Sequence, residues 1–369
     1  MEPIEKDILK GLKICFIAGT LGVGGAERQL YLIIRTLKHL GSQVSLISLT
    51  GGEYWELPIK EIGVSYYSLN GKGSRIQRLL KIILLLRRLK PQIVQSQHFY
   101  TNLYVAVSAW FLNNISIGAS RSDLEVDVKG NGVFGMVSVL WPRFFIVNSM
   151  KSFEQALAMG KSKSRLFYLP NALDTTKFNN KLKHSIRQNE PFTLISIGRL
   201  DSGKRFDKFI ELIKKMKTSN SRRVKGILIG SGVLEHELKQ FAIDSGLEAN
   251  ELEFIAHTSQ PEYYLRNADI FVLTSEFEGT PNVVLEAMAC GLPVITTKVG
   301  NLPYLIKDME NGFFFDGSVD NLLEVVLSLM DDKGILKKVS KNAIQKIEGY
   351  YSIRTLEINL VNIYTSIIK

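Results

Sequence analysis

Short apolar segments that end in glycine or small polar residues recur along this chain, and stretches of helical periodicity separate them. Residues 13–19 (KICFIAG) fit a buried strand that ends in a glycine loop, and residues 24–41 then place apolar side chains on one helical face. Residues 43–50 alternate polar and apolar side chains, and residues 92–98 supply another strand. Strands that alternate with helices predict a parallel sheet covered by helices, an α/β fold.

The alternation breaks once and then restarts. Residues 171–191 are polar and lack both periodicities, whereas residues 192–198 (FTLISIG) open a second series of strands and helices. A length of 369 residues also exceeds what one ordinary core accommodates. We predict two Rossmann-like domains that face each other across a cleft. The predicted parts are an N-terminal domain over 1–175, a linker over 176–191, a C-terminal domain over 192–350 and an amphipathic C-terminal helix over 351–369 that crosses back to the first domain.

Nothing in the sequence has the character of a membrane span or a leader. The first residues mix acids and bases, and the longest apolar run, residues 79–86, contains Lys81 and is far shorter than the ~20 residues a spanning helix needs. Cys15 and Cys290 both lie in apolar segments, which favours buried free thiols over a disulfide or a zinc site. We expect a cytoplasmic protein, free or peripheral on the inner face of the cytoplasmic membrane.

The chain is basic, with a net charge of +10 and a pI of about 9.3, which favours anionic partners. No zinc-finger spacing or other nucleic-acid motif accompanies the charge, so we expect no nucleic-acid partner. Residues 72–90 form a basic amphipathic segment with no acid. Two interpretations stay open: a helix in contact with an anionic membrane, or a helix buried on one side with a solvated cationic edge.

The most informative stretch is residues 274–297 (TSEFEGTPNVVLEAMACGLPVITT). A strand ends near Ser275 and a helix begins near Asn282, so the amides of residues 279–283 would be exposed at a helix N-terminus that favours anions. Glu278 lies on the loop and Glu286 one turn into the helix. Amides for a phosphate and carboxylates for hydroxyl groups predict a site for a nucleotide-linked sugar.

With seven residues between them, Glu278 and Glu286 match the Glu-x7-Glu signature of retaining glycosyltransferases with the GT-B fold, and EGTPNVVLEAMACGLPV resembles family 4 (group 1) of these enzymes. The resemblance implies that Glu278 contacts donor-sugar hydroxyls and that Glu286 holds the nucleotide ribose. It further implies a donor-binding set around the loops, which comprises Gly24, Gly25, His257, Gly279, Thr280, Pro281, Asn282, Val283 and Glu286.

Two cations follow the first strand of the second domain, Arg199 and Lys204 in SIGRLDSGKRFD. Fixed cations there can neutralise a departing diphosphate, and the resemblance gives both residues this catalytic role. Many family members have glycine after the lysine, where this chain has Arg205.

The glycine-rich turn after the first strand, TLGVGGAERQL, fails as a dinucleotide fingerprint because Glu27 replaces the third glycine. It resembles instead the first loop of the family, where the amides of Gly24 and Gly25 approach phosphate and acceptor. Glu27 itself either acts there or only complements the helix N-terminus. His98, at the end of a strand, matches a histidine that the family often has near the transferring sugar. Arg121 is a candidate for an acceptor phosphate, with a solvated loop arginine as the alternative.

No Asp-x-Asp occurs in the chain. We expect neither a metal ion nor a cofactor, with Arg199, Lys204 and helix amides in place of the metal. The predicted reaction moves a hexose or N-acetylhexosamine, with a UDP-sugar favoured as donor, to a glycan or lipid-linked acceptor in cell-surface polysaccharide synthesis. The alternatives are a non-catalytic nucleotide-sugar-binding protein and a sugar-nucleotide epimerase or hydrolase of the same fold.

Overall fold

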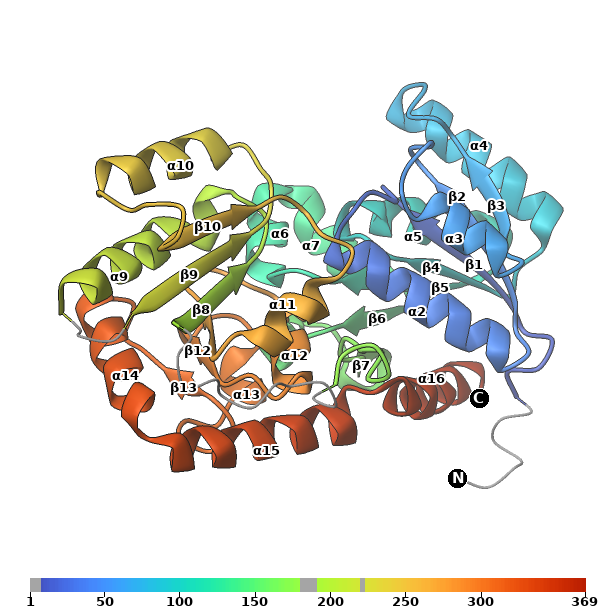
Figure 1. The fold of residues 1–369 in the computed structure, drawn as a ribbon. Coiled ribbons are helices and arrows are strands. Elements are labelled where there is room, and N and C mark those ends of the chain that lie inside the picture. Colours follow the sequence, from blue (N-terminus) through green and yellow to red (C-terminus); the bar gives the residue numbers. More distant parts are fainter. Residues whose placement is uncertain (1–7, 180–190, 220–222) are drawn as a thin grey trace. The chain divides into compact units, whose positions relative to one another are not determined.

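The computed structural model of the chain describes residues 8–179, 191–219 and 223–369 and is drawn in Figure 1. Its contacts divide the chain into two compact units. Unit 1 comprises Met1–Ala172 together with Ile353–Lys369, and unit 2 comprises Leu173–Ser352. Most of the segment predicted as a linker, residues 180–190, lies outside the described residues.

Unit 1 contains a seven-stranded parallel sheet in the order β3-β2-β1-β4-β5-β6-β7. Its strands are β1 (Lys13–Ala18), β2 (Gln43–Ser48), β3 (Ser65–Ser68), β4 (Ile93–Ser96), β5 (Ile115–Ser120), β6 (Phe144–Val147) and β7 (Leu166–Tyr168). Its α-helices are α2 (Gly25–His39), α3 (Glu56–Glu61), α4 (Arg75–Leu89), α5 (Asn102–Leu112), α6 (Leu124–Gly130), α7 (Val133–Leu140), α8 (Met150–Ala158) and α16 (Ile353–Ile368), with 3-10 turns η1 (Phe99–Thr101) and η2 (Lys163–Arg165).

The central strand β1 is buried on both faces, as a parallel strand between two helical layers should be. Ile14 and Phe16 pack into the core under α2 and α16, whereas Cys15 and Ile17 pack into a second core under α4 and α5. This alternation follows from the two-residue period of a strand. It explains why the segment is continuously apolar.

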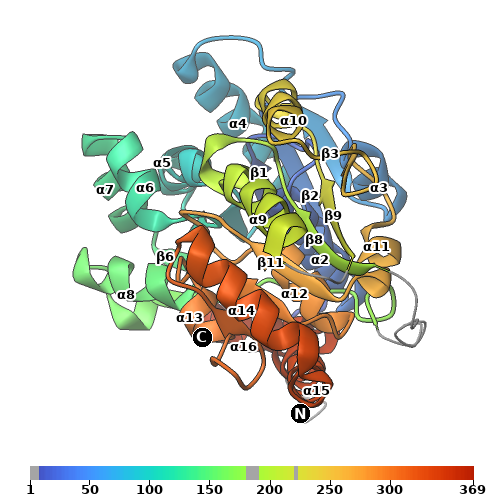
Figure 2. The ribbon, with the colours of Figure 1, turned by 60° about the vertical axis from the view of Figure 1, so that its left-hand side comes forward.

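Unit 2 repeats the plan with a six-stranded parallel sheet in the order β10-β9-β8-β11-β12-β13. Its strands are β8 (Phe192–Ile197), β9 (Val224–Ile229), β10 (Leu252–Ile255), β11 (Ile270–Leu273), β12 (Val294–Thr296) and β13 (Phe313–Phe314). Its helices are the 3-10 turn η3 (Ser202–Lys204) and α9 (Phe206–Ser219), α10 (Glu235–Asp244), α11 (Pro261–Asn267), α12 (Asn282–Ala289), α13 (Leu302–Leu305), α14 (Val319–Asp331) and α15 (Lys333–Tyr350). Figure 2 shows α9 and α14 side by side over one face of this sheet.

Each sheet reverses its direction of winding at one place. In unit 1 the reversal lies between the neighbours β1 and β4, and in unit 2 between β8 and β11. Loops that leave the carboxyl ends of such strands diverge to opposite faces and leave a crevice, where open α/β sheets bind ligands. The loop pairs that matter are therefore those after β1 and β4 and those after β8 and β11. The prediction of two Rossmann-like α/β domains is confirmed.

The last helix, α16, packs with unit 1 although the rest of unit 2 precedes it in the chain. Leu360 and Tyr364 are fully buried in the same core as α2, and the Tyr364 hydroxyl donates to Gln95 Oε1 on β4 at 2.5 Å. The predicted return of the C-terminal helix to the first domain is confirmed. No helix among the described residues is long and apolar enough to cross a membrane.

Candidate active site

Lys204 and Glu278 form an ion pair at the winding reversal of unit 2, with Nζ 2.5 Å from Oε1. Lys204 ends η3, after β8, and Glu278 lies on the loop after β11. Ser275 Oγ also donates to Glu278 Oε1 at 2.8 Å. Both charged side chains are mostly buried, with 21% and 9% of their side-chain surfaces exposed. The sequence predicted both residues, and the structure brings them into direct contact.

Backbone contacts lock these two loops together. The Thr274 hydroxyl donates to the Lys204 carbonyl at 2.8 Å, and the Glu276 amide donates to the Gly203 carbonyl at 2.9 Å. A Cβ on Gly203 would lie 2.6 Å from the half-exposed Phe277 ring, so a larger residue there would displace that ring. Hydrogen bonds between the two loops thus hold Lys204 and Glu278 next to each other.

The loop after β11 leads directly into the N-terminus of α12, as predicted. Its N-cap is Pro281, and no side chain caps the helix. Thr280 is buried, and Gly279, Asn282 and Val283 are half-buried. Gly300 adopts φ +55°, and a Cβ there would lie 2.0 Å from the Glu278 carbonyl, so glycine is needed to let the loop after β12 approach. Glu286 is 3% exposed within α12.

Arg199 and His257 lie outside this cluster. Arg199 pairs with Asp201, Nε to Oδ2 at 2.9 Å, and its side chain is 77% exposed. His257 is exposed in the loop after β10, two strands away from β8 in the sheet. Among the described contacts, neither reaches Lys204 or Glu278.

Arg205, the departure from the family pattern, is anchored by carboxylates that sequence reasoning did not single out. It adopts φ +50° and binds Asp207 and Glu276. These hydrogen bonds, first those with Asp207 and then the one with Glu276, raise the pKa of the guanidinium further. Arg205 therefore connects η3 to the loop after β11 through Glu276.

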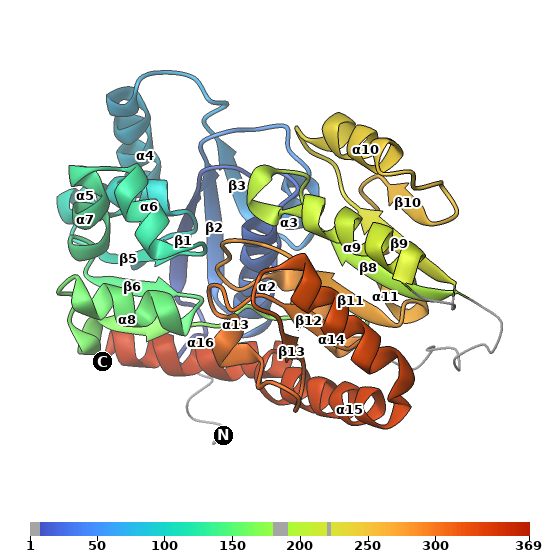
Figure 3. The ribbon, with the colours of Figure 1, turned by 90° about the vertical axis from the view of Figure 1, so that its left-hand side faces the viewer.

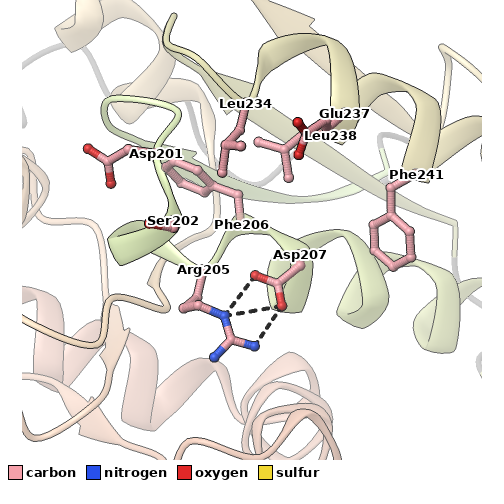
Figure 4. A pocket seen from close by; sticks show the side chains of 9 residues that line it. All are labelled: Asp201, Ser202, Arg205, Phe206, Asp207, Leu234, Glu237, Leu238 and Phe241. Atoms are coloured by element: carbon pink, nitrogen blue, oxygen red, sulfur yellow. Dashed lines mark hydrogen bonds and ion pairs between the residues drawn. The ribbon is translucent and has the colours of Figure 1, made fainter.

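A cavity of about 290 Å³ lies beside this loop and is drawn in Figure 4. Phe206, Leu234 and Phe241 give it an apolar lining, and Asp201 and Glu237 add negative charge. In Figure 4 the Arg205 guanidinium is turned toward Asp207. Lys204 and Glu278 do not line this cavity, and its carboxylates disfavour a diphosphate. We therefore locate the site at the ion pair.

A second cluster occupies the winding reversal of unit 1. The Gly19 amide donates to His98 Nδ1 at 3.1 Å, and His98 Nε2 lies 3.2 Å from Glu27 Oε1. Because an amide can only donate, Nδ1 accepts, and the proton resides on Nε2 and is donated to Glu27. The Thr20 hydroxyl donates to the same Glu27 oxygen at 2.8 Å. Both ring nitrogens of His98 are thus engaged within unit 1.

This network fixes the glycine loop on which Gly24 and Gly25 lie. Gly24 is the N-cap of α2, with Gly25 its first residue, and a Cβ on Gly24 would lie 2.2 Å from a Glu27 carboxylate oxygen. The Tyr100 ring stacks on His98 at 5.5 Å between centroids, and its hydroxyl occupies the space that a Cβ on Gly19 would need. Sequence reasoning did not single out Thr20 or Tyr100, because only the fold brings them to Glu27 and His98.

Arg121, proposed from the sequence for an acceptor phosphate, is a buried guanidinium and not a solvated loop residue. Nη1 donates to the Leu169 carbonyl at 3.2 Å, whereas Nε and Nη2 are buried without a hydrogen-bond partner among the described residues. Burial lowers the pKa of Arg121 to about 10, so the side chain stays charged at neutral pH. In the described ranges no group of three or more His, Cys, Asp or Glu side chains is arranged to hold a metal ion.

Two family models match the chain and together span most of it. The model described as glycosyl transferases group 1 matches residues 177–346, and that described as glycosyltransferase family 4 matches residues 23–177. Among curated proteins, the N-acetylgalactosamine-N,N'-diacetylbacillosaminyl-diphospho-undecaprenol 4-alpha-N-acetylgalactosaminyltransferase of Campylobacter jejuni is 26% identical over 342 residues, which are 88% of this chain and 91% of that protein. The UDP-Gal:alpha-D-GlcNAc-diphosphoundecaprenol alpha-1,3-galactosyltransferase of Escherichia coli is 28% identical over 199 residues, 51% of each chain.

Solved structures show the same architecture. Anabaena HepE in complex with UDP and glucose superimposes with a TM-score of 0.84 at 18% identity, over 96% of this chain and 100% of that one. The sucrose-phosphate synthase of Thermosynechococcus elongatus superimposes with a TM-score of 0.78 at 15% identity, over 96% of this chain and 99% of that one. At these identities the likeness concerns the fold, and the roles of individual residues rest on the geometry above.

Proposed function

We propose a reaction for this chain, which belongs to the group 1 glycosyltransferases of family 4. The chain moves a hexose or N-acetylhexosamine from a UDP-sugar to a lipid-linked glycan. The transfer retains the configuration at C1 and needs no metal ion. The enzyme would act in the synthesis of a polysaccharide or a lipid-linked glycan.

The observation that carries the proposal is the Lys204–Glu278 pair beside the N-terminus of α12. A diphosphate at this strand edge would lie near the Lys204 ammonium and the amides of Gly279 and Thr280, which compensate its charge in place of a metal. Glu278 Oε1 already accepts from Lys204 and Ser275, and its other oxygen can accept from a donor-sugar hydroxyl. Glu286, buried in the same helix, is proposed to hold the ribose.

The relatives support the donor and the stereochemistry. The Escherichia coli relative is named for UDP-Gal and for an alpha-1,3 product, and the Campylobacter jejuni relative for a 4-alpha product. An α-linked product from an α-linked nucleotide sugar is a retaining outcome. HepE holds UDP in a solved structure of the same fold. Both relatives are named for acceptors on diphospho-undecaprenol, which supports a lipid-linked acceptor here.

The proposed step balances as follows. The bond between C1 of the sugar and the diphosphate oxygen breaks, and its electron pair leaves with the nucleoside diphosphate. The acceptor hydroxyl oxygen forms a bond to C1 on the same face of the sugar, and its proton passes to the departing phosphate oxygen. Lys204 and Arg199 stabilise the charge that develops on the diphosphate, and an exposed Arg199 can turn toward it. Glu278 orients the sugar and forms no covalent bond.

In unit 1, His98 is proposed to hold the glycine loop in position and not to exchange protons with the substrate. Its hydrogen bonds hold the Gly19 amide and the Glu27 carboxylate, and through them the loop that presents the Gly24 and Gly25 amides. Arg121 is proposed to bind the acceptor diphosphate with the two nitrogens that lack a partner, because a buried unpaired guanidinium is costly and an anion would satisfy it.

The test is an incubation of the purified chain in EDTA with UDP-, GDP- and ADP-sugars and a diphospho-undecaprenol-linked sugar as acceptor. We expect UDP release that depends on the acceptor, and an α-linked product by NMR. A β-linked product would refute retention, and activity only after Mg²⁺ is restored would refute metal independence. Sugar release without an acceptor would identify a hydrolase, and UDP-sugar binding without turnover on any acceptor would identify a binding protein.

A further inference from the structure

Unit 1 exposes large apolar side chains along one layer of helices. Figure 3 shows α4, α5 and α7 in this layer, and contacts join α4 to α5 and α5 to α7. We name its outer surface the apolar face and define it by side chains that are 48–69% exposed. These side chains are Leu80, Leu84, Trp110, Phe111, Phe134 and Trp141. Large apolar side chains that gather exposed on one layer of helices mark an interaction surface.

On α4, Leu80 and Leu84 continue a stripe that begins at Ile76, and all three side chains are more than half exposed. Their spacing of four residues places them on one side of the helix. Ile82 and Leu86 are fully buried on the opposite side and pack into the core below. The helix is thus apolar on two sides, and only one of them is needed for the fold.

Aromatic residues gather where α5 and α7 end. Trp110 and Phe111 lie in the last turn of α5 and form an edge-on pair with ring centroids 4.9 Å apart. They are 69% and 62% exposed. Trp141 follows α7 directly and is 48% exposed. Because α5 leads into β5 and α7 into β6, and these strands are neighbours, the two helix ends lie side by side. Tryptophan concentrates where an apolar phase meets water.

The charge on the α4 and α5 part of the apolar face has a single sign. Residues 62–122 contain eight lysines and arginines and no aspartate or glutamate. On α4 itself Arg75, Lys81, Arg87 and Arg88 are exposed beside the leucine stripe. A second copy of the chain would bring these same cations against one another across a symmetric interface, which disfavours a dimer. An anionic surface with an apolar interior complements both the charge and the aromatic side chains.

We propose that the apolar face docks unit 1 onto a membrane that carries anionic lipids, with the aromatic side chains inserted at the headgroup boundary and the α4 cations against phosphate. This inference rests on the proposed function, because docking would serve to bring the enzyme to a lipid-linked acceptor. Because α4 follows the carboxyl end of β3, and α6 with α7 after it follows that of β5, the face begins at the carboxyl edge of the sheet. It runs to the opposite edge, where Trp110, Phe111 and Trp141 lie near the amino ends of β5 and β6.

The experiment is sedimentation of the full chain with vesicles of phosphatidylcholine alone and of equimolar phosphatidylcholine and phosphatidylglycerol. We expect binding to the anionic vesicles only, weakened by salt. Two double variants test the face, and each should reduce vesicle binding at least ~10-fold. One is Trp110→Gln with Phe111→Gln, and the other is Arg87→Glu with Arg88→Glu. Two double variants at exposed positions of unit 2 are the matched controls: Ile243→Gln with Tyr350→Gln, and Lys337→Glu with Lys338→Glu. Both control proteins should bind vesicles as the wild type does.

Tryptophan fluorescence and UDP binding of each variant establish that it is folded. Equal vesicle binding by wild type and both face variants would overturn the inference. A different result would also overturn it: the wild type forms a dimer in solution, Trp110→Gln with Phe111→Gln dissociates that dimer, and no form of the protein binds vesicles. A second copy of the chain would then be what covers the face. UDP binding without vesicle binding refutes only this inference, whereas vesicle binding without UDP or UDP-sugar binding refutes the proposed function.

Discussion

Lys204 and Glu278 are separated by 74 residues of sequence and joined by an ion pair of 2.5 Å. The pair links the loops after the two strands at which the sheet of unit 2 reverses its winding. The two charges neutralise each other in a mostly buried position. Removal of either one would therefore leave the other as an unpaired, partly desolvated charge, which is energetically costly. A bound diphosphate would compete with Glu278 for the ammonium.

The first prediction concerns this pair. Glu278→Gln should lower kcat about 10²-fold, because the variant keeps the shape of the side chain but loses the charge that orients the sugar and aligns Lys204. Glu276→Gln is the matched control: Glu276 lies two residues away, its side chain is 47% exposed, and it pairs with Arg205. The glutamine keeps an oxygen that can accept from Arg205, so kcat should stay within about 3-fold of wild type. The measurement is kcat for each variant at saturating UDP-sugar and acceptor. Near-normal turnover by Glu278→Gln would end the assigned role.

The second prediction is a pH dependence. Burial alone would raise the pKa of Glu27, but hydrogen bonds from His98 and Thr20 outweigh it, so the pKa lies below its ordinary value of 4.5. A carboxyl with a lower pKa in the folded chain stabilises the fold above the unfolded pKa, and this contribution disappears as the pH falls through the folded pKa. Glu27→Gln should therefore cost about 1.5–3 kcal/mol at pH 7, and the difference from wild type should shrink below pH 4.5.

The measurement is urea unfolding followed by tryptophan fluorescence. Trp55, Trp110 and Trp141 are the three tryptophans of the chain and all belong to unit 1, so the signal reports on the unit that contains Glu27. Glu61→Gln, at the end of α3, serves as an exposed carboxylate control. A difference between Glu27→Gln and wild type that stays constant from pH 7 to pH 3.5 would show that the carboxylate charge is not what stabilises the loop.

The sequence predicted the class of fold and the elements on which the candidate residues lie, because buried parallel strands and the start of α12 have local signatures. The segment 13–19 is apolar throughout, since β1 is covered on both faces, and Glu278 lies between a strand end and a helix start, as expected. The pairing of Lys204 with Glu278 and of His98 with Glu27 has no such signature. These contacts depend on which strands become neighbours, and local periodicity does not determine that order.

The face of α4 shows a different limit of sequence reasoning. Residues 79–86 are apolar around most of the helix, so periodicity does not reveal which side packs against the sheet. The structure buries Ile82 and Leu86 and leaves Leu80 and Leu84 exposed. Arg121 was ambiguous for a similar reason, because burial of a loop arginine depends on the neighbouring Leu169 segment and on α16.

The third prediction concerns the cysteines. Cys15 and Cys290 are both buried, and burial raises the pKa of the Cys15 thiol to about 12. Since the thiolate is the reactive form, neither residue of the native protein should react with iodoacetamide at pH 8, and both should react in urea. Ser164→Cys, at an exposed position, supplies a reactive control. Mass spectrometry that finds either native cysteine modified as fast as this control would contradict their burial.

The fourth prediction concerns Arg121 and the acceptor. Arg121→Gln removes the fork of donors that we propose for the acceptor diphosphate, so the KM for the lipid-linked acceptor should rise about 10-fold or more while the KM for the donor is unchanged. Arg165→Gln, exposed at the end of η2, should change neither. If Arg121→Gln lowers only the urea midpoint of unit 1 and leaves both KM values as they were, Arg121 serves to hold the Leu169 segment and not the acceptor.

The last prediction concerns the return of α16 to unit 1. The Tyr364 hydroxyl is fully buried and donates to Gln95 Oε1, while Gln95 Nε2 is buried without a hydrogen-bond partner among the described residues. Tyr364→Phe keeps the ring in the core and leaves Gln95 with no side-chain partner, so unit 1 should lose about 1–3 kcal/mol of unfolding free energy by tryptophan fluorescence. Tyr350→Phe, an exposed tyrosine at the end of α15, should lose at most about 0.5 kcal/mol. Equal midpoints for Tyr364→Phe and wild type would show that α16 is held by apolar packing alone, through side chains such as Leu360.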